Sequence, residues 1–100
     1  MFHLFQSIPT LEARTLYPFV ISGQTFLGVA NAYHDSSKKQ YAQSVVYQAS
    51  GARFIKYQEI PTHGGWDMTA FEYKGHNYLA VANRYKDGKY NINSALYKWV

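Results

Sequence analysis

The sequence predicts an all-β protein, and three observations carry this prediction. First, the chain repeats itself: "FQSIPT" at residues 5–10 returns as "YQEIPT" at residues 57–62, within a repeat of about 50 residues, a period typical of β-propellers and other arrays. Second, aromatic residues make up 18% of the chain, and aromatic side chains favour strands. Third, Gly-containing turn signals separate short apolar runs, whereas helical capping patterns are rare.

The repeat runs through nearly the whole chain. After a two-residue insertion in the first copy, its last part matches at a slightly shorter spacing. We therefore divide the single domain, residues 1–100, into tandem repeats at about 2–49 and 54–100. The matches are Phe2, Gln6, Ile8, Pro9, Thr10, Phe19, Gly23, Leu27, Val29, Ala30, Asn31, Tyr33, Asp35, Lys39, Ser44 and Tyr47 with Phe54, Gln58, Ile60, Pro61, Thr62, Phe71, Gly75, Leu79, Val81, Ala82, Asn83, Tyr85, Asp87, Lys89, Ser94 and Tyr97.

Two corresponding strands are predicted at residues 24–33 and 76–85. Both sequences, "QTFLGVANAY" and "HNYLAVANRY", are apolar on both alternating faces, as in strands that are buried on both sides. Small residues on one face would let a second sheet approach closely. These residues are Gly28, Ala30, Ala80 and Ala82.

The remaining strands follow from turn signals. Ser22-Gly23 and Lys74-Gly75 suit tight hairpins and are preceded by strands at 16–21 and 68–73. Third strands are predicted at 43–48 and 93–99. A fourth strand at 53–60 has its counterpart at 2–8, and Pro9 and Pro61 end this pair because proline lacks the donor that a ladder needs.

Four antiparallel strands per repeat, apolar on both faces, predict two β-propeller blades. The long connection "IPTHGGWD" (60–67) would cross between blades, so the chain opens with an orphan strand and its last blade lacks an outer strand. We expect the N-terminal strand to complete the last blade of a neighbouring subunit and so close a full propeller by homo-oligomerisation. Three subunits would give six blades, which we favour, and four would give eight.

Composition excludes several functions. The formal net charge of +4 comes from dispersed Lys and Arg, which argues against a nucleic-acid stripe, and no run is long enough for membrane insertion. No signal peptide is visible. The chain has no Cys, its His residues lack metal-ligand spacing, and no nucleophile or phosphate-binding motif occurs. We expect no enzyme, no cofactor and no metal site.

The inter-blade connection of the second repeat is the first candidate ligand-binding surface. His63, Trp66 and Asp67 bring an imidazole, a flat apolar face and a carboxylate close together, which suits sugar recognition. In the alternative interpretation, Trp66 packs between blades and Asp67 caps the turn. Arg14 stands in the equivalent loop of the first repeat, so the two loops cannot form identical sites.

A second candidate surface is the loop "ANRYKDGKYN", where Arg84, Tyr85, Lys86 and Tyr90 combine cations with aromatic rings that suit anionic glycans or phosphates. Tyr33 belongs to the matching stretch of the first repeat. The alternative is a solvated hairpin tip. The repeated Asn31 and Asn83 are interpreted as turn residues that bond the backbone rather than a ligand.

The second repeat, "FIKYQEIPTHGGWDMTAFEYKGHNYLAVANRYKDGKYNINSALYKW", resembles the epilepsy-associated repeat, also called the epitempin repeat. The first repeat departs from the pattern where "LEART" replaces "HGGWD". The resemblance implies extracellular, non-enzymatic propeller modules that bind other molecules, such as cell-surface receptors. The family's propellers typically have seven repeats in one chain, so blade number and ligand surface do not carry over.

From these observations we predict a multivalent, carbohydrate-binding lectin of the β-propeller type. Oligomerisation would repeat each weak sugar site and supply avidity. The alternative is an extracellular protein–protein module that binds a receptor. In both cases the partners are a glycan or a cell-surface protein together with further copies of the chain.

Overall fold

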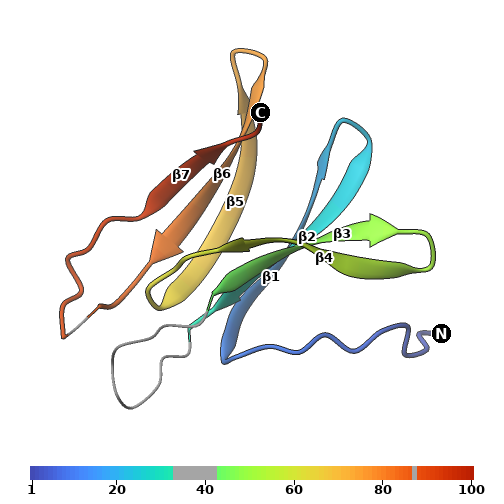
Figure 1. The fold of residues 1–100 in the computed structure, drawn as a ribbon, viewed down its shortest axis with the longest axis horizontal. Helices are drawn as coiled ribbons and strands as arrows, with labels where there is room; N and C mark the ends of the chain where they lie inside the picture. Colours follow the sequence, from blue (N-terminus) through green and yellow to red (C-terminus); the bar gives the residue numbers. More distant parts are fainter. Residues whose placement is uncertain (33–42, 87) are drawn as a thin grey trace.

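The computed structural model describes residues 1–32, 43–86 and 88–100, which form two antiparallel β-sheets and no helix. There is accordingly no helix here that could span a membrane. The sheets lie side by side (Figure 1) and confirm the all-β prediction. The first sheet contains, in spatial order, β1 (Ala13–Ile21), β2 (Gln24–Asn31), β3 (Ser44–Ser50) and β4 (Arg53–Ile60); the second contains β5 (Gly65–Tyr73), β6 (His76–Asn83) and β7 (Ala95–Lys98).

The hairpins form where the glycine signals placed them. Ser22 and Gly23 connect β1 to β2 with φ angles of 51° and 76°, and Lys74 and Gly75 connect β5 to β6 with 49° and 78°. Positive φ at both central residues gives a hairpin turn whose twist matches that of the strands. The connection between β2 and β3 lies outside the described residues.

The two sheets pack face to face through apolar side chains. Phe26 and Val46 of the first sheet meet Leu79 and Tyr97 of the second. Close to this contact, a Cβ added at Gly28 would lie 2.7 Å from Met68 Sδ. The small residue is therefore needed for close approach, as the sequence indicated. β1 and β5 contact each other, so these two strands form the inner edges of the pair of blades.

The N-terminal segment is the part expected to complete the last blade of a neighbouring subunit. Residues 2–8 form no strand in the single chain, because a strand needs a partner for its main-chain groups and none is present here. The segment is nevertheless attached at two points. Ile8 packs on the far face of the first sheet, and the side-chain amide of Gln6 bonds both main-chain groups of Phe54, at 2.8 Å to its oxygen and 2.7 Å from its nitrogen.

Candidate functional site

A buried polar network lies at one end of the first sheet. In the first sheet Ser44 Oγ accepts the N–H of Asn31 at 3.1 Å and bonds Thr62 Oγ1 at 2.9 Å. Gly65, which begins β5, packs against this network: an added Cβ would lie 2.8 Å from Ser44 Oγ and 2.9 Å from Asn31 O. The second glycine of "HGG" is therefore required by packing against the neighbouring blade.

Asn31 and Asn83 fasten the loops around this network. Asn31 Oδ1 accepts the N–H of Leu11 at 3.0 Å, and its Nδ2 donates to Gln43 O at 2.9 Å. Asn83 repeats both bonds, with the N–H of His63 at 2.9 Å and with Asn93 O at 3.1 Å. Both residues bond the backbone, as interpreted from the sequence.

β-Bulges direct Arg14 and Trp66 into one surface. The register of β1 on β2 shifts between Ala13 and Thr15, and that of β5 on β6 shifts between Gly65 and Asp67, so Arg14 and Trp66 are the bulged residues at equivalent positions. Bulges re-aim side chains and are frequent beside functional sites. The Arg14 guanidinium lies 4.7 Å from the centre of the Trp66 ring.

Arg84 adds a second guanidinium to the same ring. It follows β6, and its N–H donates to His63 O and Gly64 O at 3.2 and 3.1 Å, which places its side chain over the bulge. Its Cζ lies 4.6 Å from the centre of the Trp66 ring and 5.0 Å from that of Tyr90. Tyr90 in turn packs edge-on against Tyr85 at 5.1 Å. We call Arg14, Trp66, Arg84, Tyr85 and Tyr90 the cation–aromatic cluster.

The cation–aromatic cluster is open to solvent and positively charged. Trp66 is 40% exposed and Tyr90 62% exposed. Arg14 approaches Glu12 at 3.7 Å, but both side chains are exposed and such pairs contribute little. Within the described residues, no carboxylate lies within ion-pairing distance of Arg84. Lys86 and Lys89 pair through their main chains in the nearby hairpin and add two exposed ammonium groups.

Asp67 makes two hydrogen bonds through one carboxylate oxygen. Its Oδ1 accepts the main-chain N–H of Met68 at 2.8 Å and the Thr15 hydroxyl at 3.3 Å. The same hydroxyl lies 2.9 Å from Trp66 O and ties β1 to β5. This arrangement fits the alternative interpretation of Asp67 as a cap, while Trp66 itself remains half open to solvent.

In the structure, residues of the two candidate surfaces that were predicted separately from the sequence lie together. Trp66 of the first predicted surface and Arg84, Tyr85 and Tyr90 of the second meet, and Arg14 of the other repeat joins them. Lys86 lies at the hairpin beside the cluster, and His63 lies half-buried in the supporting loop. Tyr33 lies outside the described residues.

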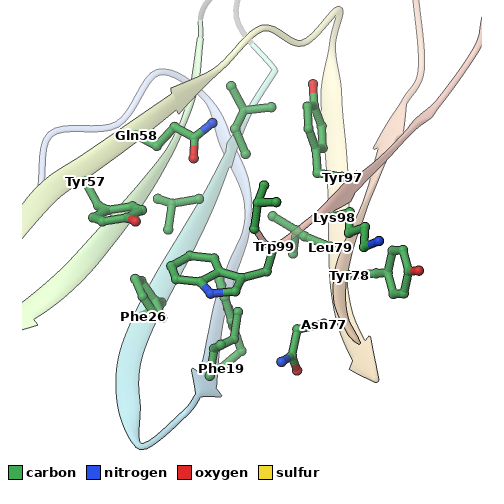
Figure 2. A pocket seen from close by; sticks show the side chains of 14 residues that line it. Phe19, Phe26, Tyr57, Gln58, Asn77, Tyr78, Leu79, Tyr97, Lys98 and Trp99 are labelled. Atoms are coloured by element: carbon green, nitrogen blue, oxygen red, sulfur yellow. The ribbon is translucent and has the colours of Figure 1, made fainter. Parts of the chain in front are cut away.

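A second feature, absent from the sequence analysis, is an aromatic pocket between the sheets. Figure 2 shows the Trp99 side chain from the end of β7 beside Phe26 and Tyr57 of the first sheet. Its ring centre lies 5.5 Å from that of Phe26 and 5.9 Å from that of Tyr57. The pocket encloses about 220 Å³, and Gln58 of β4 lines its upper side in Figure 2. Only the duplication, which pairs Trp99 with the far smaller Ala49, could have pointed to it.

No group of three metal-ligating side chains occurs within residues 1–32, 43–86 and 88–100. The cation–aromatic cluster presents guanidinium groups beside aromatic rings. Such groups bind anions and π-systems.

Comparison with known proteins agrees with the resemblance stated from the sequence. The family model described as the EPTP domain matches residues 1–48 and again residues 53–100. The human thrombospondin-type laminin G domain and EAR repeat-containing protein is 40% identical over 97 residues, and its mouse counterpart is 36% identical over 97 residues. These matches cover 95% of this chain but 14% of each relative.

Proposed function

This chain belongs to the EPTP domain family, whose repeats are β-propeller blades, and on that premise we propose that it is a non-enzymatic recognition module. We propose further that it acts outside the cell and binds an acidic protein surface. The binding surface in this proposal is the cation–aromatic cluster, which requires neither cofactor nor metal.

One observation carries the proposal: two guanidinium groups lie over a single exposed tryptophan ring, at 4.7 and 4.6 Å. Arginine, tryptophan and tyrosine are the residues that dominate binding energy at protein interfaces. A guanidinium held over an aromatic ring is pre-ordered, so less side-chain entropy is lost when it meets a carboxylate.

The same contacts argue against stacking of a neutral sugar. With Arg14 and Arg84 over its ring, Trp66 does not offer the bare aromatic face that a sugar ring would need. In addition, one oxygen of Asp67 already accepts a main-chain N–H. The charge of this surface favours a ligand with carboxylates or sulfates instead.

A second candidate is the multivalent lectin, now restricted to anionic glycans. It is favoured by the exposure of Trp66 together with the four cations Arg14, Arg84, Lys86 and Lys89. Weak single sites would need several copies on one assembly to give avidity.

Fluorescence titration separates these candidates. Trp66 and Trp99 are the two tryptophans, so Trp99→Phe leaves Trp66 as the reporter. The probes are a short Glu-rich peptide, a heparin oligosaccharide and a neutral oligosaccharide. We expect the peptide to change the Trp66 emission, and Arg84→Ala to weaken its binding about 30-fold, the effect of losing an interface residue worth about 2 kcal/mol.

Arg53→Ala is the matched control, because it removes the same charge from an exposed position at the start of β4. Equal losses for Arg84→Ala and Arg53→Ala would mean that only net charge matters, which contradicts the proposed site. Binding of heparin alone would favour the lectin. Binding of the neutral sugar alone would contradict both candidates.

A further inference from the structure

The two outer faces of the chain repeat the two faces that already pack together inside it. The near face of the second sheet uses Met68, Leu79, Val81 and Tyr97. Their repeat counterparts lie on the far face of the first sheet: Leu16, Leu27, Val29 and Tyr47. Conversely, the near face of the first sheet uses Phe19, Ile21, Phe26 and Val46, whose counterparts Phe71, Tyr73, Tyr78 and Leu96 stand on the second sheet.

Local geometry supports this equivalence. Phe19 stacks on Phe26 at 5.4 Å between ring centres, and their counterparts Phe71 and Tyr78 stack at 5.5 Å. Yet Phe71 is exposed where Phe19 is half-buried, and Tyr78 is half-buried where Phe26 is buried. The second sheet therefore presents a packing face without its partner.

The side chains at the centre of the two outer faces also have complementary sizes. Inside the chain, Met68 lies against Gly28. The counterparts are Leu16, which is 59% exposed, and Ala80, which lines a shallow hollow with Ala82 and Thr69. A shorter side chain thus faces a residue that is larger by one methyl group.

The outer edge of the second sheet, at β7, lacks the strand that the first sheet has at the same place. β4 pairs with β3 so that Phe54 faces Ala49 and Ile55 faces Gln48. The counterpart of β3 is β7, and the counterpart of β4 is residues 2–8, which form no strand here. Met1, Phe2, Leu4 and Phe5 are exposed.

Gln6 shows how an incoming segment would be held. Its amide bonds both main-chain groups of Phe54, one blade further along. The counterpart of Gln6 is Gln58, whose side chain lines the aromatic pocket beside β7, and the counterpart of Phe54 is Phe2. Gln58 is thus placed to bond the main chain of Phe2 from a second copy of the chain.

We propose that the N-terminal segment of a second copy adds to the open edge of β7 and inserts Phe2 into the aromatic pocket. Phe54 packs with Ile8 beside Tyr47, and by the repeat Phe2 of the second copy packs with Ile60 beside Tyr97. The register is Trp99 opposite Phe2, Lys98 opposite His3 and Tyr97 opposite Leu4. The occupant is identified by the repeat itself, because residues 2–8 are the counterpart of the strand that fills this place in the first sheet.

The contact is head-to-tail, so each copy both gives and receives a segment, and identical rotations close a ring. Propellers typically have about 4–8 blades, which allows two to four copies of a two-blade chain. Three copies remain our expected ring. At the inner edge the repeat does not match, because Ala13 is the counterpart of Gly65, which packs closely on the first sheet. The contact between two chains must therefore be slightly wider at this point.

The first test is the mass of the purified chain by light scattering and sedimentation over a range of concentrations. We expect a discrete multiple of the 11.5 kDa chain. Phe2→Ala should raise the protein concentration at which half of the oligomer dissociates by at least tenfold. It should not affect the fold of the single chain, since Phe2 is fully exposed there. His3→Ala, which leaves the pocket contact intact, is the matched control.

A second variant blocks the edge rather than the pocket. The Trp99 N–H donates to Asn77 O at 2.8 Å, toward β6, so by alternation the Lys98 N–H points to the open edge. Lys98→Pro removes that donor and should abolish assembly, whereas Lys98→Ala should not. A monomer at all concentrations, or an oligomer that survives both Phe2→Ala and Lys98→Pro, overturns the proposal.

Cysteine trapping tests the register directly, because the chain has no cysteine of its own. The pair Lys98→Cys with His3→Cys should form intermolecular disulfides on oxidation, in a ladder that ends at the ring size. The pair Lys98→Cys with Leu4→Cys is one residue out of register and should link poorly, because neighbouring residues point to opposite faces. Equal linking of both pairs overturns the register. These readouts do not depend on the ligand of the cation–aromatic cluster.

Discussion

The first and second sheets are built from one repeated sequence but differ in how well they are covered. β2 is buried along its second half, because the second sheet covers one face and Ile8 helps to cover the other. In β6, the counterpart strand, Val81 alone is buried and the remaining residues are partly or fully exposed. The comparison teaches that burial in this fold is set by the neighbouring blade rather than by the strand's own residues.

A second contrast concerns function. The polar scaffold is repeated almost atom for atom, since Asn31 and Asn83 make the same main-chain bonds. The surface above it is not repeated: Arg14 corresponds to Trp66, and Ala32 corresponds to Arg84. Among the described residues, the cation–aromatic cluster is therefore built from positions at which the two repeats differ, above a scaffold that they share.

The largest effect is expected from Gly65→Ala, which breaks the packing of one sheet on the polar network of the other. The added Cβ would meet Ser44 Oγ, Asn31 O and Thr62 Oγ1 at 2.8, 2.9 and 3.1 Å. We expect a loss of about 3 kcal/mol in the free energy of unfolding, from overpacking and strained buried hydrogen bonds. Chemical denaturation followed by fluorescence measures it.

Gly75→Ala provides the comparison for Gly65→Ala. It has open space around the added Cβ but a φ of 78°, so backbone strain alone should cost about 1 kcal/mol. Equal losses in the two variants would show that the contact between the sheets does not constrain Gly65.

Asn31→Ala and Asn83→Ala compare the two scaffolds directly. Asn31 is buried and Asn83 half-buried, so we expect losses of about 2–3 and about 1 kcal/mol in unfolding free energy. At concentrations where copies assemble, the difference between the two losses in unfolding free energy should become smaller, because the added blade would cover Asn83. Equal losses in a dilute monomer would contradict the role assigned to burial.

Much of the fold could be predicted because its signals are local. The turns at Ser22-Gly23 and Lys74-Gly75 and the strand at 53–60 follow from residues adjacent in sequence. The contact between Arg14 and Trp66 could not be predicted in this way. It depends on two bulges and on the relative placement of two sheets, which no short sequence pattern encodes.

The N-terminal segment shows a second reason why the sequence could not predict the whole fold. Residues 2–8 carry the pattern of a strand, yet the single chain leaves them unpaired. A strand is a property of a pair, because its main-chain donors and acceptors need partners. The sequence could indicate the segment's preference but not where its partner lies.

The centre of the contact between the sheets gives a smaller effect. Gly28→Ala copies Ala80 into the first sheet, and we expect it to cost about 1–2 kcal/mol in unfolding free energy because the new methyl meets Met68 Sδ. Met68→Leu copies Leu16 and should relieve the clash. A double-mutant cycle should therefore show a favourable coupling of about 0.5–1 kcal/mol. Additive losses would mean that the sizes at these positions are not matched.

The smallest effect on stability is expected in the cation–aromatic cluster, where the two repeats differ most. Trp66→Ala and Arg84→Ala should each lower the unfolding free energy by at most about 1 kcal/mol, because both side chains are exposed. Their coupling in a double-mutant cycle should be about 0.5–1 kcal/mol, the strength of an exposed cation–π contact. Binding of the Glu-rich peptide, compared in a Trp99-containing background by calorimetry, should instead fall strongly in both. A collapse of the fold in Trp66→Ala would contradict this division, since it would make the ring part of the scaffold that the two repeats share.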